Sequence, residues 1–171
     1  MSKPTIAQAL RRIKIIKGRI AEHRSRAINS VSYEVNKQPA FNFSEEMNAM
    51  KVAQSELIDL EAKVARANAV TDIQDVYGGN VTVTLTHAIR QLQELKGWIA
   101  FLKELELKTG TSRERVSEWD DTKNDFVTFH KEVSHVSDLS EKARDESIKN
   151  CQDHFESLNN AVEDANHKTQ I

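Results

Sequence analysis

The side chains most able to bind a metal in this 171-residue chain are six histidines, and their spacing predicts no metal site. No two of them have the HExxH spacing of a helical zinc site. In a strand, His130 and His135 would point to opposite faces. We therefore expect surface or helix-cap histidines and no metal, for a set that comprises His23, His87, His130, His135, His154 and His167.

Two further motifs could bind ions or cofactors, and both lack required residues. Counted from Asp121, an EF-hand needs an oxygen ligand at position three and Gly at position six, where this chain has Lys123 and Phe126. Gly78-Gly79 has neither the Lys-Ser/Thr of a P-loop nor the third glycine of a dinucleotide fingerprint. We therefore expect no bound cofactor, and predict a hairpin turn over Asp120–Asp125.

Cys151 is the only cysteine, and it falls on the apolar stripe of a predicted helix. A free cysteine packs there as a small hydrophobic side chain, and no nucleophile motif surrounds it. With no G-x-S-x-G motif or glycosidase-like carboxylate pair, we expect no catalytic residue and no enzyme. The single cysteine fits a reducing compartment, and no signal peptide pattern is present, so we expect a cytoplasmic protein.

A charge asymmetry is the feature with the clearest functional meaning. Residues 1–30 carry eight Lys or Arg against Glu22, a net charge of +7, and residues 44–75 carry seven acids against three bases, or −4. A basic amphipathic helix can bind anionic membrane or nucleic acid, but this segment lacks aromatic residues that would stack on bases. We favour pairing with Glu56, Asp59 and Glu61 of the next helix. The candidate interaction surface is Arg12, Lys17, Arg19, Arg24 and Arg26.

The elements that position these residues are mainly helical. Residues 50–71 repeat apolar side chains at three-then-four spacing, so this helix needs helical partners. Its stripe is Met50, Ala53, Leu57, Leu60, Val64 and Ala67. The preceding helix has the stripe Ile6, Leu10, Ile13, Ile16, Ile20 and Ala27, and the last has Ile148, Cys151, Phe155, Leu158, Val162 and Ala165.

Capping residues set the expected helix limits, about 5–28, 45–70, 85–108 and 138–168. Thr5 and Ser44 are the predicted caps of the first two helices. The third should open at Thr84 and stop at Gly110, and Ser137 or Asp138 should cap the fourth.

Short β elements are expected between the helices, at about 31–35, 76–83 and 115–133. Val31–Val35 alternates with period two, and Gly78-Gly79 and Asp120–Asp125 are tight turns between two arms each.

Four segments of the chain carry a resemblance to a known family: Ile6–Leu10, Arg66–Thr71, Gly79–Ile89 and Leu158–Ile171. In these segments the chain resembles the septicolysin-like family of uncharacterised bacterial and phage proteins. The resemblance departs at His87, where an acid is usual, and at extra residues around Gln74–Tyr77. It implies a mostly helical, oligomeric protein with small β elements and no established activity.

We therefore expect a single, mainly α domain over residues 1–171, with long antiparallel helices in a coiled-coil-like bundle and small β-hairpins. The expected function is a non-enzymatic scaffold or interaction protein that forms a homo-oligomer, because thin helical packing leaves apolar surface for a second copy. Two alternatives remain open. One is a phage-encoded inhibitor that binds a host protein complex, and the other is binding of anionic membrane or nucleic acid by the basic first helix.

Overall fold

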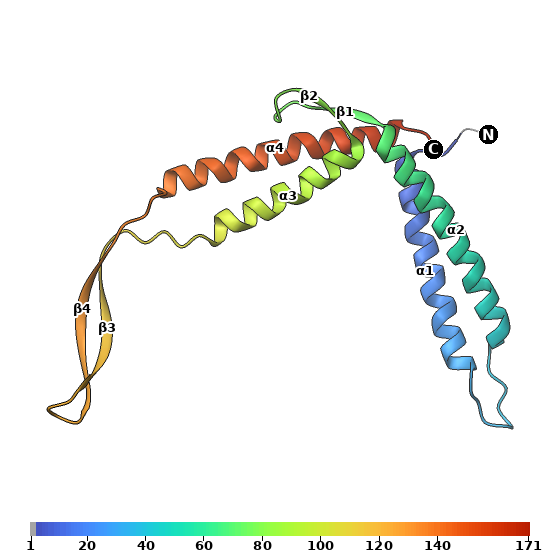
Figure 1. The fold of residues 1–171 in the computed structure, drawn as a ribbon. Helices are drawn as coiled ribbons and strands as arrows, with labels where there is room; N and C mark the ends of the chain where they lie inside the picture. The colour runs from blue at the N-terminus through green and yellow to red at the C-terminus, as the bar shows by residue number, and fades with distance from the viewer. Residues whose placement is uncertain (1–2) are drawn as a thin grey trace. The chain divides into compact units, whose positions relative to one another are not determined.

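The computed structural model describes residues 3–171, which belong to two compact units. One unit comprises Met1–Gln93 and His154–Ile171, and the other Glu94–Asp153. The described chain is mainly α-helical with two small antiparallel sheets, as the sequence predicts, whereas the single domain stays a prediction. The elements in Figure 1 are α1 (Ile6–Ser30), α2 (Phe43–Val70), β1 (Asp72–Asp75), β2 (Val81–Thr84), α3 (Leu85–Glu104), β3 (Gly110–Asp120), β4 (Asp125–His135) and α4 (Glu141–Lys168).

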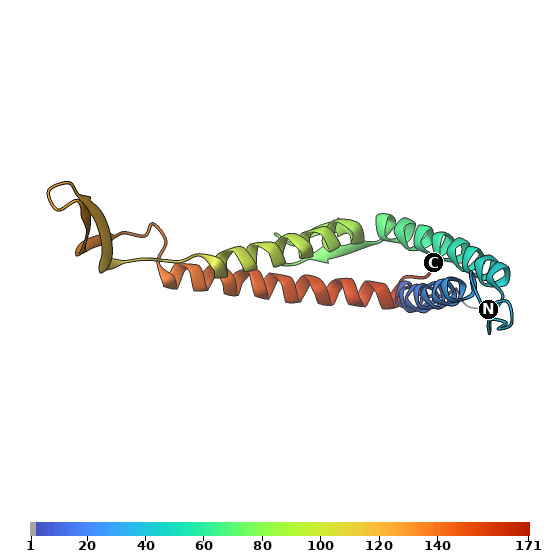
Figure 2. The same ribbon diagram turned by 90° about the horizontal axis from the view of Figure 1, so that it is seen from below.

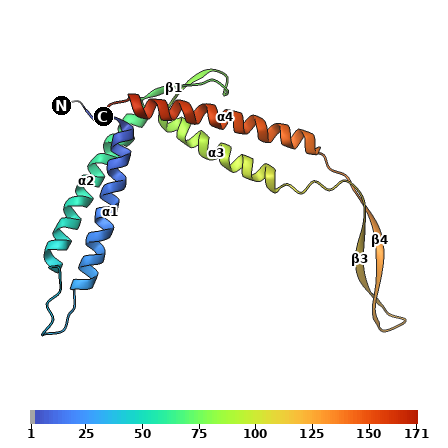
Figure 3. The ribbon, with the colours of Figure 1, turned by 180° about the vertical axis from the view of Figure 1, so that it is seen from behind.

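Helices α1 and α2 lie side by side in opposite directions, as Figures 1 and 3 show. Their apolar seams meet as predicted, and Leu57, Leu60, Ala67 and Ile171 pack against a buried cluster of Ile6, Ala9, Ile13 and Val64. Leu10 was expected in the stripe but is 45% exposed, and Ala9 is buried instead. One residue turns a helix by about 100°, so Ala9 and Leu10 cannot both face α2.

The helix caps show where local chemistry departs from the expected limits. Thr5 caps α1 in a reciprocal capping box with Gln8, as predicted for Thr5. Ser44 is not the cap of α2, because Asn42 Oδ1 accepts the Ser44 and Glu45 N–H groups. The predicted cap of α4, Ser137 or Asp138, is also wrong. Ser140 Oγ accepts the Ala143 N–H, and α4 begins at Glu141.

The first β-hairpin leads from α2 into α3. Strands β1 and β2 pair Asp72 with Thr84 and Asp75 with Val81. Val76 and Tyr77 were expected in a strand arm but lie in the turn, which moves the first arm back to β1. Gly79 and Asn80 have positive φ angles of 94° and 56°, the conformation that Gly and Asn adopt most readily.

The second β-hairpin is longer than predicted, since β3 and β4 have 11 residues each. Its turn is the expected one, with Asp120 paired to Asp125, the Lys123 N–H donating to the Asp120 carbonyl, and Asn124 at a φ of 48°. Within the unit Glu94–Asp153, the described helix segments do not pack against β3 and β4 (Figure 2).

Two further predictions are wrong, a strand at Val31–Val35 and the C-terminal limit of α3. Val31–Val35 forms no strand but a loop, because no described strand pairs with it and its apolar side chains are exposed. Helix α3 ends at Glu104, short of residue 108, and Gly110 does not cap it but opens β3 at a φ of 83°. Within residues 3–171, no helix is both long and apolar enough to cross a membrane.

Candidate interaction surfaces

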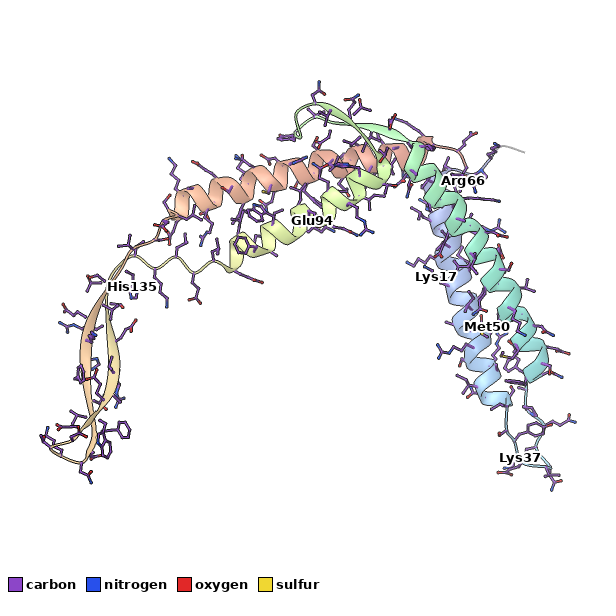
Figure 4. The ribbon with its side chains drawn as sticks, viewed as in Figure 1. Lys17, Lys37, Met50, Arg66, Glu94 and His135 are labelled. Atoms are coloured by element: carbon purple, nitrogen blue, oxygen red, sulfur yellow. The ribbon has the colours of Figure 1, made fainter. Side chains whose placement is uncertain are left out.

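Three predicted interaction residues of α1 form ion pairs with α2. The Arg12 Nε and Arg19 Nη2 donate to Glu56 at 2.9 and 2.8 Å, and Lys17 Nζ lies 2.8 Å from Glu61 Oε1. Figure 4 labels Lys17 on α1. The hydrogen bonds from Arg12 and Arg19 hold the pKa of Glu56 below its ordinary value. The expected pairing is therefore present for Arg12, Lys17 and Arg19.

Arg26 belongs to a second charged group near the end of α1. Its guanidinium contacts Glu22 within α1, lies 3.9 Å from Glu46 of α2, and sits 4.6 Å over the Phe41 ring. Glu46 also lies 2.6 Å from Nδ1 of His23. These contacts connect the end of α1 to the start of α2 and to the loop before it.

Arg24 differs from the other four predicted residues. Within residues 3–171 it has no ion pair, and neither have Lys3, Arg11 and Lys14 of the same basic segment. Arg24 borders an apolar groove of about 280 Å³ between α1 and α2. The rest of the groove is lined by Ala27, Ile28, Val31, Phe43, Met47 and Met50. Part of the basic surface is therefore available to an outside ligand.

The β3–β4 hairpin has two unlike faces, because directly paired residues of an antiparallel ladder share a face. One face carries an apolar stripe, in which Val116 pairs with Phe129, Val127 follows toward the turn, and Val133 toward the helices. The three valines are half-buried and Phe129 is 39% exposed, although no helix of the same unit packs against the hairpin.

The opposite face of the hairpin is polar except at its turn. Trp119 and Phe126 pair there with their rings edge to face and their centroids 5.1 Å apart. Farther from the turn on this face, Ser117 Oγ lies 3.1 Å from Thr128 Oγ1, and Arg113 donates to Glu132 at 3.3 Å. Both aromatic side chains are at least half exposed, which leaves two large rings available for a partner.

A second exposed aromatic pair lies on α3. Trp98 and Phe101 have ring centroids 5.2 Å apart, and their side chains are 55% and 45% exposed. Large exposed aromatic side chains are enriched at protein interfaces relative to the rest of a surface. The pair therefore adds to the apolar surface of the unit that contains the β3–β4 hairpin.

A buried polar cluster joins the β1–β2 turn to α3 and α4. Asp75 is 2% exposed, and its carboxylate lies 2.9 Å from His154 Nε2. It also accepts the Gly78 N–H at 2.8 Å and the Gln91 side-chain amide at 2.9 Å. The Tyr77 ring stacks on the His154 ring with centroids 6.0 Å apart.

The pKa of Asp75 is lowered in this cluster. Burial alone would raise it, but the hydrogen bonds from Gly78 and Gln91 and the nearby His154 favour the carboxylate and outweigh burial. No group of three or more His, Cys, Asp or Glu side chains in the described chain is arranged to hold a metal. We interpret the cluster as a structural tie between elements that are distant in sequence.

His154 corrects the expectation that all six histidines are surface or cap residues. Its side chain is 17% exposed and lies within the Asp75 cluster. The sequence offered a weak signal, because His154 stands three residues after Cys151 and four before Leu158 on the predicted apolar stripe. Nothing in the local pattern connected it to Asp75, 79 residues earlier.

No protein-family model matches the sequence, and no curated protein matches it at a significant level. The fold is similar to that in the crystal structure of a functionally unknown conserved protein from Corynebacterium diphtheriae. The TM-score is 0.71 over 99% of each chain, with 16% sequence identity. At this identity the similarity shows a shared fold.

Proposed function

We propose that this protein is a non-enzymatic scaffold that assembles with further copies of itself and offers binding surfaces to other proteins. One observation supports the proposal, namely the β3–β4 hairpin, whose apolar stripe and aromatic pair are covered by no helix of the hairpin's own unit. A two-stranded hairpin is at best marginally stable in water, and needs more strands or a packing partner. A second copy supplies that partner with no further component.

We also propose that the chain is a cytoplasmic member of the septicolysin-like family. The four resembling segments support this assignment, and so does a fold shared with a conserved bacterial protein of unknown function. Its single cysteine fits a reducing compartment.

Light scattering coupled to gel filtration tests the scaffold proposal. At micromolar concentration we expect a mass that is a multiple of the 19.4 kDa chain mass. A mass near 19.4 kDa would refute self-association. Replacing Val116, Val127 and Val133 by Ser should shift the mass toward the monomer.

A matched control separates loss of the hairpin stripe from a general loss of apolar surface. Val35, Val52 and Val70 are at least 71% exposed outside the hairpin. Their replacement by Ser also removes three valine side chains, but none from the hairpin stripe, and should leave the mass unchanged.

Binding of anionic membrane or nucleic acid remains a second candidate, favoured by the cations of α1 that have no ion pair among the described residues. Co-sedimentation with anionic vesicles and a duplex DNA shift at two salt concentrations test it, since phosphate binding weakens steeply with salt. The third candidate, an inhibitor of a host complex, is tested by capture of a defined complex from host lysate. Release of that complex by the Trp119→Ala and Phe126→Ala variants would support it.

A further inference from the structure

We infer that β4 is the edge through which two copies join, by antiparallel pairing of β4 with β4 of a second copy about an axis at His130. This inference rests on the proposed self-association and names the surface that produces it. It predicts a four-stranded sheet in the order β3, β4, β4 and β3.

Both outer edges of the hairpin are regular enough to accept another strand. The ladder is unbroken from Gly110↔His135 to Asp120↔Asp125, so it contains no bulge, and residues 110–135 contain no proline. Bulges, prolines and charged side chains are the usual means by which proteins block edge pairing. Of these three, only charge is present here, and the two strands differ in it.

Strand β3 carries more charge than β4. Five of the 11 residues of β3 are charged, against Asp125, Lys131 and Glu132 of β4, and Phe126–His130 of β4 contains no Lys, Arg, Asp or Glu. Aromatic and β-branched residues, which favour strand pairing, fill most of that stretch. The charged residues of β3 are Arg113, Glu114, Arg115, Glu118 and Asp120.

Charge also opposes self-pairing of β3. In a symmetric pair, an axis at Glu114 or Arg115 sets identical charges against each other, and an axis at Val116 sets Glu114 against Glu118. Like charges directly opposite each other destabilise a sheet. The edge of β3 therefore disfavours a second copy of itself near the middle of the strand.

For β4, the axis at His130 lets all 11 residues of both copies pair. It sets Asp125 opposite His135 and places no like charges opposite each other. An axis at Lys131 or Glu132 would oppose identical charges, and an axis at Thr128 or Phe129 would leave the end of β4 unpaired. The His130 register therefore satisfies both overlap and charge.

This register also extends the apolar stripe. Val127 falls opposite Val133 of the second copy, and Phe129 falls opposite the alkyl stem of Lys131. Each of these pairs occurs twice because of the two-fold axis. The stripe then runs across four strands, which exceeds the strand number at which an isolated sheet becomes stable.

Cysteine cross-linking tests the register on the full chain. In a Cys151→Ser background, His130→Cys places two thiols directly opposite across the axis, and mild oxidation should give a disulfide-linked dimer. Arg115→Cys is the matched control, because Arg115 pairs with His130 on the same face of the same hairpin. It lies on the β3 edge and should remain monomeric on non-reducing gels.

A charge substitution tests the same pairing without a thiol. Thr128→Asp sets an acid opposite Glu132 twice in the dimer and should raise its dissociation constant roughly tenfold in analytical ultracentrifugation. Ser117→Asp adds the same charge on β3, directly across from Thr128, and should leave the constant unchanged.

The outcomes separate this inference from the proposed function. An oligomeric protein in which His130→Cys fails to cross-link, or Arg115→Cys cross-links equally well, would overturn β4 pairing and leave the scaffold proposal standing. A monomeric wild-type protein would overturn both.

Discussion

The α1–α2 pair and the β3–β4 hairpin are both antiparallel two-element hairpins, but only the first has an interior. Ile6, Ile13 and Val64 are buried between the two helices. In the β-hairpin, no large apolar side chain reaches the same degree of burial. The difference follows from geometry, because two helices can face each other with their stripes, whereas two paired strands share one sheet and expose both faces.

The charges do not differ in this way, because both hairpins contain internal ion pairs. Arg12, Lys17 and Arg19 of α1 find acids on α2 within the hairpin. In the β-hairpin, Arg113 pairs with Glu132 on one face, whereas no helix of the same unit packs against the apolar stripe on the other face. One chain therefore contains an element pair that buries its apolar side chains internally and an element pair that does not, and the location of buried apolar area distinguishes them.

The largest expected effect comes from Ile16, which is fully buried on α1. Ile16→Ala should lower the free energy of unfolding by about 2–5 kcal/mol through lost transfer energy and the cavity left behind. Val116→Ala in the β-hairpin should change it by less than about 0.5 kcal/mol when the protein is dilute enough to be monomeric, since Val116 is packed by no helix of its own unit. Urea melts followed by circular dichroism measure both.

Ile15→Ala is the control within the same helix, since Ile15 is 64% exposed. It removes the same atoms from the adjacent position and should cost less than about 0.5 kcal/mol. Equal losses at positions 15 and 16 would contradict the described orientation of α1.

The second effect concerns the Asp75 cluster, in which a buried carboxylate accepts hydrogen bonds from distant segments. The described β3–β4 hairpin has no such buried cluster. Asp75→Ala leaves the Gly78 N–H, the Gln91 amide and His154 without their acceptor, at an expected cost of about 1–3 kcal/mol. Asp72→Ala, at the exposed end of the same strand, should cost less than about 0.5 kcal/mol. A similar melt for both variants would show that the cluster contributes nothing.

Helical periodicity predicted the parts of the fold that depend on repeated local signals. Three-then-four spacing identified the seam of α2, and charge asymmetry identified its pairing with α1. The turn Asp120–Asp125 identified the second β-hairpin, because turn formers there interrupt two strand-like segments. These signals lie within a few residues of one another, so a single sequence contains them.

Choices between neighbouring residues could not be predicted in the same way. Asn42 caps α2 in place of Ser44, and Ser140 caps α4 in place of Ser137 or Asp138. Several good capping residues stand close together at each site, and their intrinsic preferences differ by only a few tenths of a kcal/mol. Tertiary packing then decides where the helix starts.

The Asp75 cluster could not be predicted because its members come from three distant segments. The interval from Asp75 to Gly78 suits a side chain that accepts the N–H of a turn, but gives no sign of burial. Burial follows only when α3 brings Gln91 and α4 brings His154.

The third prediction concerns acid. The pKa of Asp75 is lower in the folded than in the unfolded chain, where it is about 3.9. The ionised Asp75 therefore contributes its full stabilisation of the folded state above the unfolded-state pKa, and this contribution is lost as pH falls through the folded-state pKa. Unfolding free energy should decline below about pH 4, and Asp75→Asn should show a shallower decline. An equal slope in both proteins would contradict this assignment.

The smallest effects per site belong to the exposed ion pairs between α1 and α2, and they also distinguish the two roles of the basic helix. Exposed ion pairs contribute little each, so the triple variant Arg12→Glu, Arg19→Glu and Arg26→Glu should melt at a modestly lower temperature. The difference should shrink at high salt, because the distance beyond which exposed charges are screened falls from about 8–10 Å at moderate salt to about 3 Å at 1 M.

If these residues serve to hold α1 against α2, the native protein and the triple variant should both bind phosphate weakly or not at all. Melting temperature and binding to anionic vesicles or duplex DNA, each at two salt concentrations, decide between the roles. In a control variant, Lys3, Arg11 and Lys14 are changed to Glu. This changes the net charge by the same amount, at positions without ion pairs among the described residues, and should not change the melting temperature. An unchanged melt together with loss of a native binding signal in the first variant would move the function to the surface of α1.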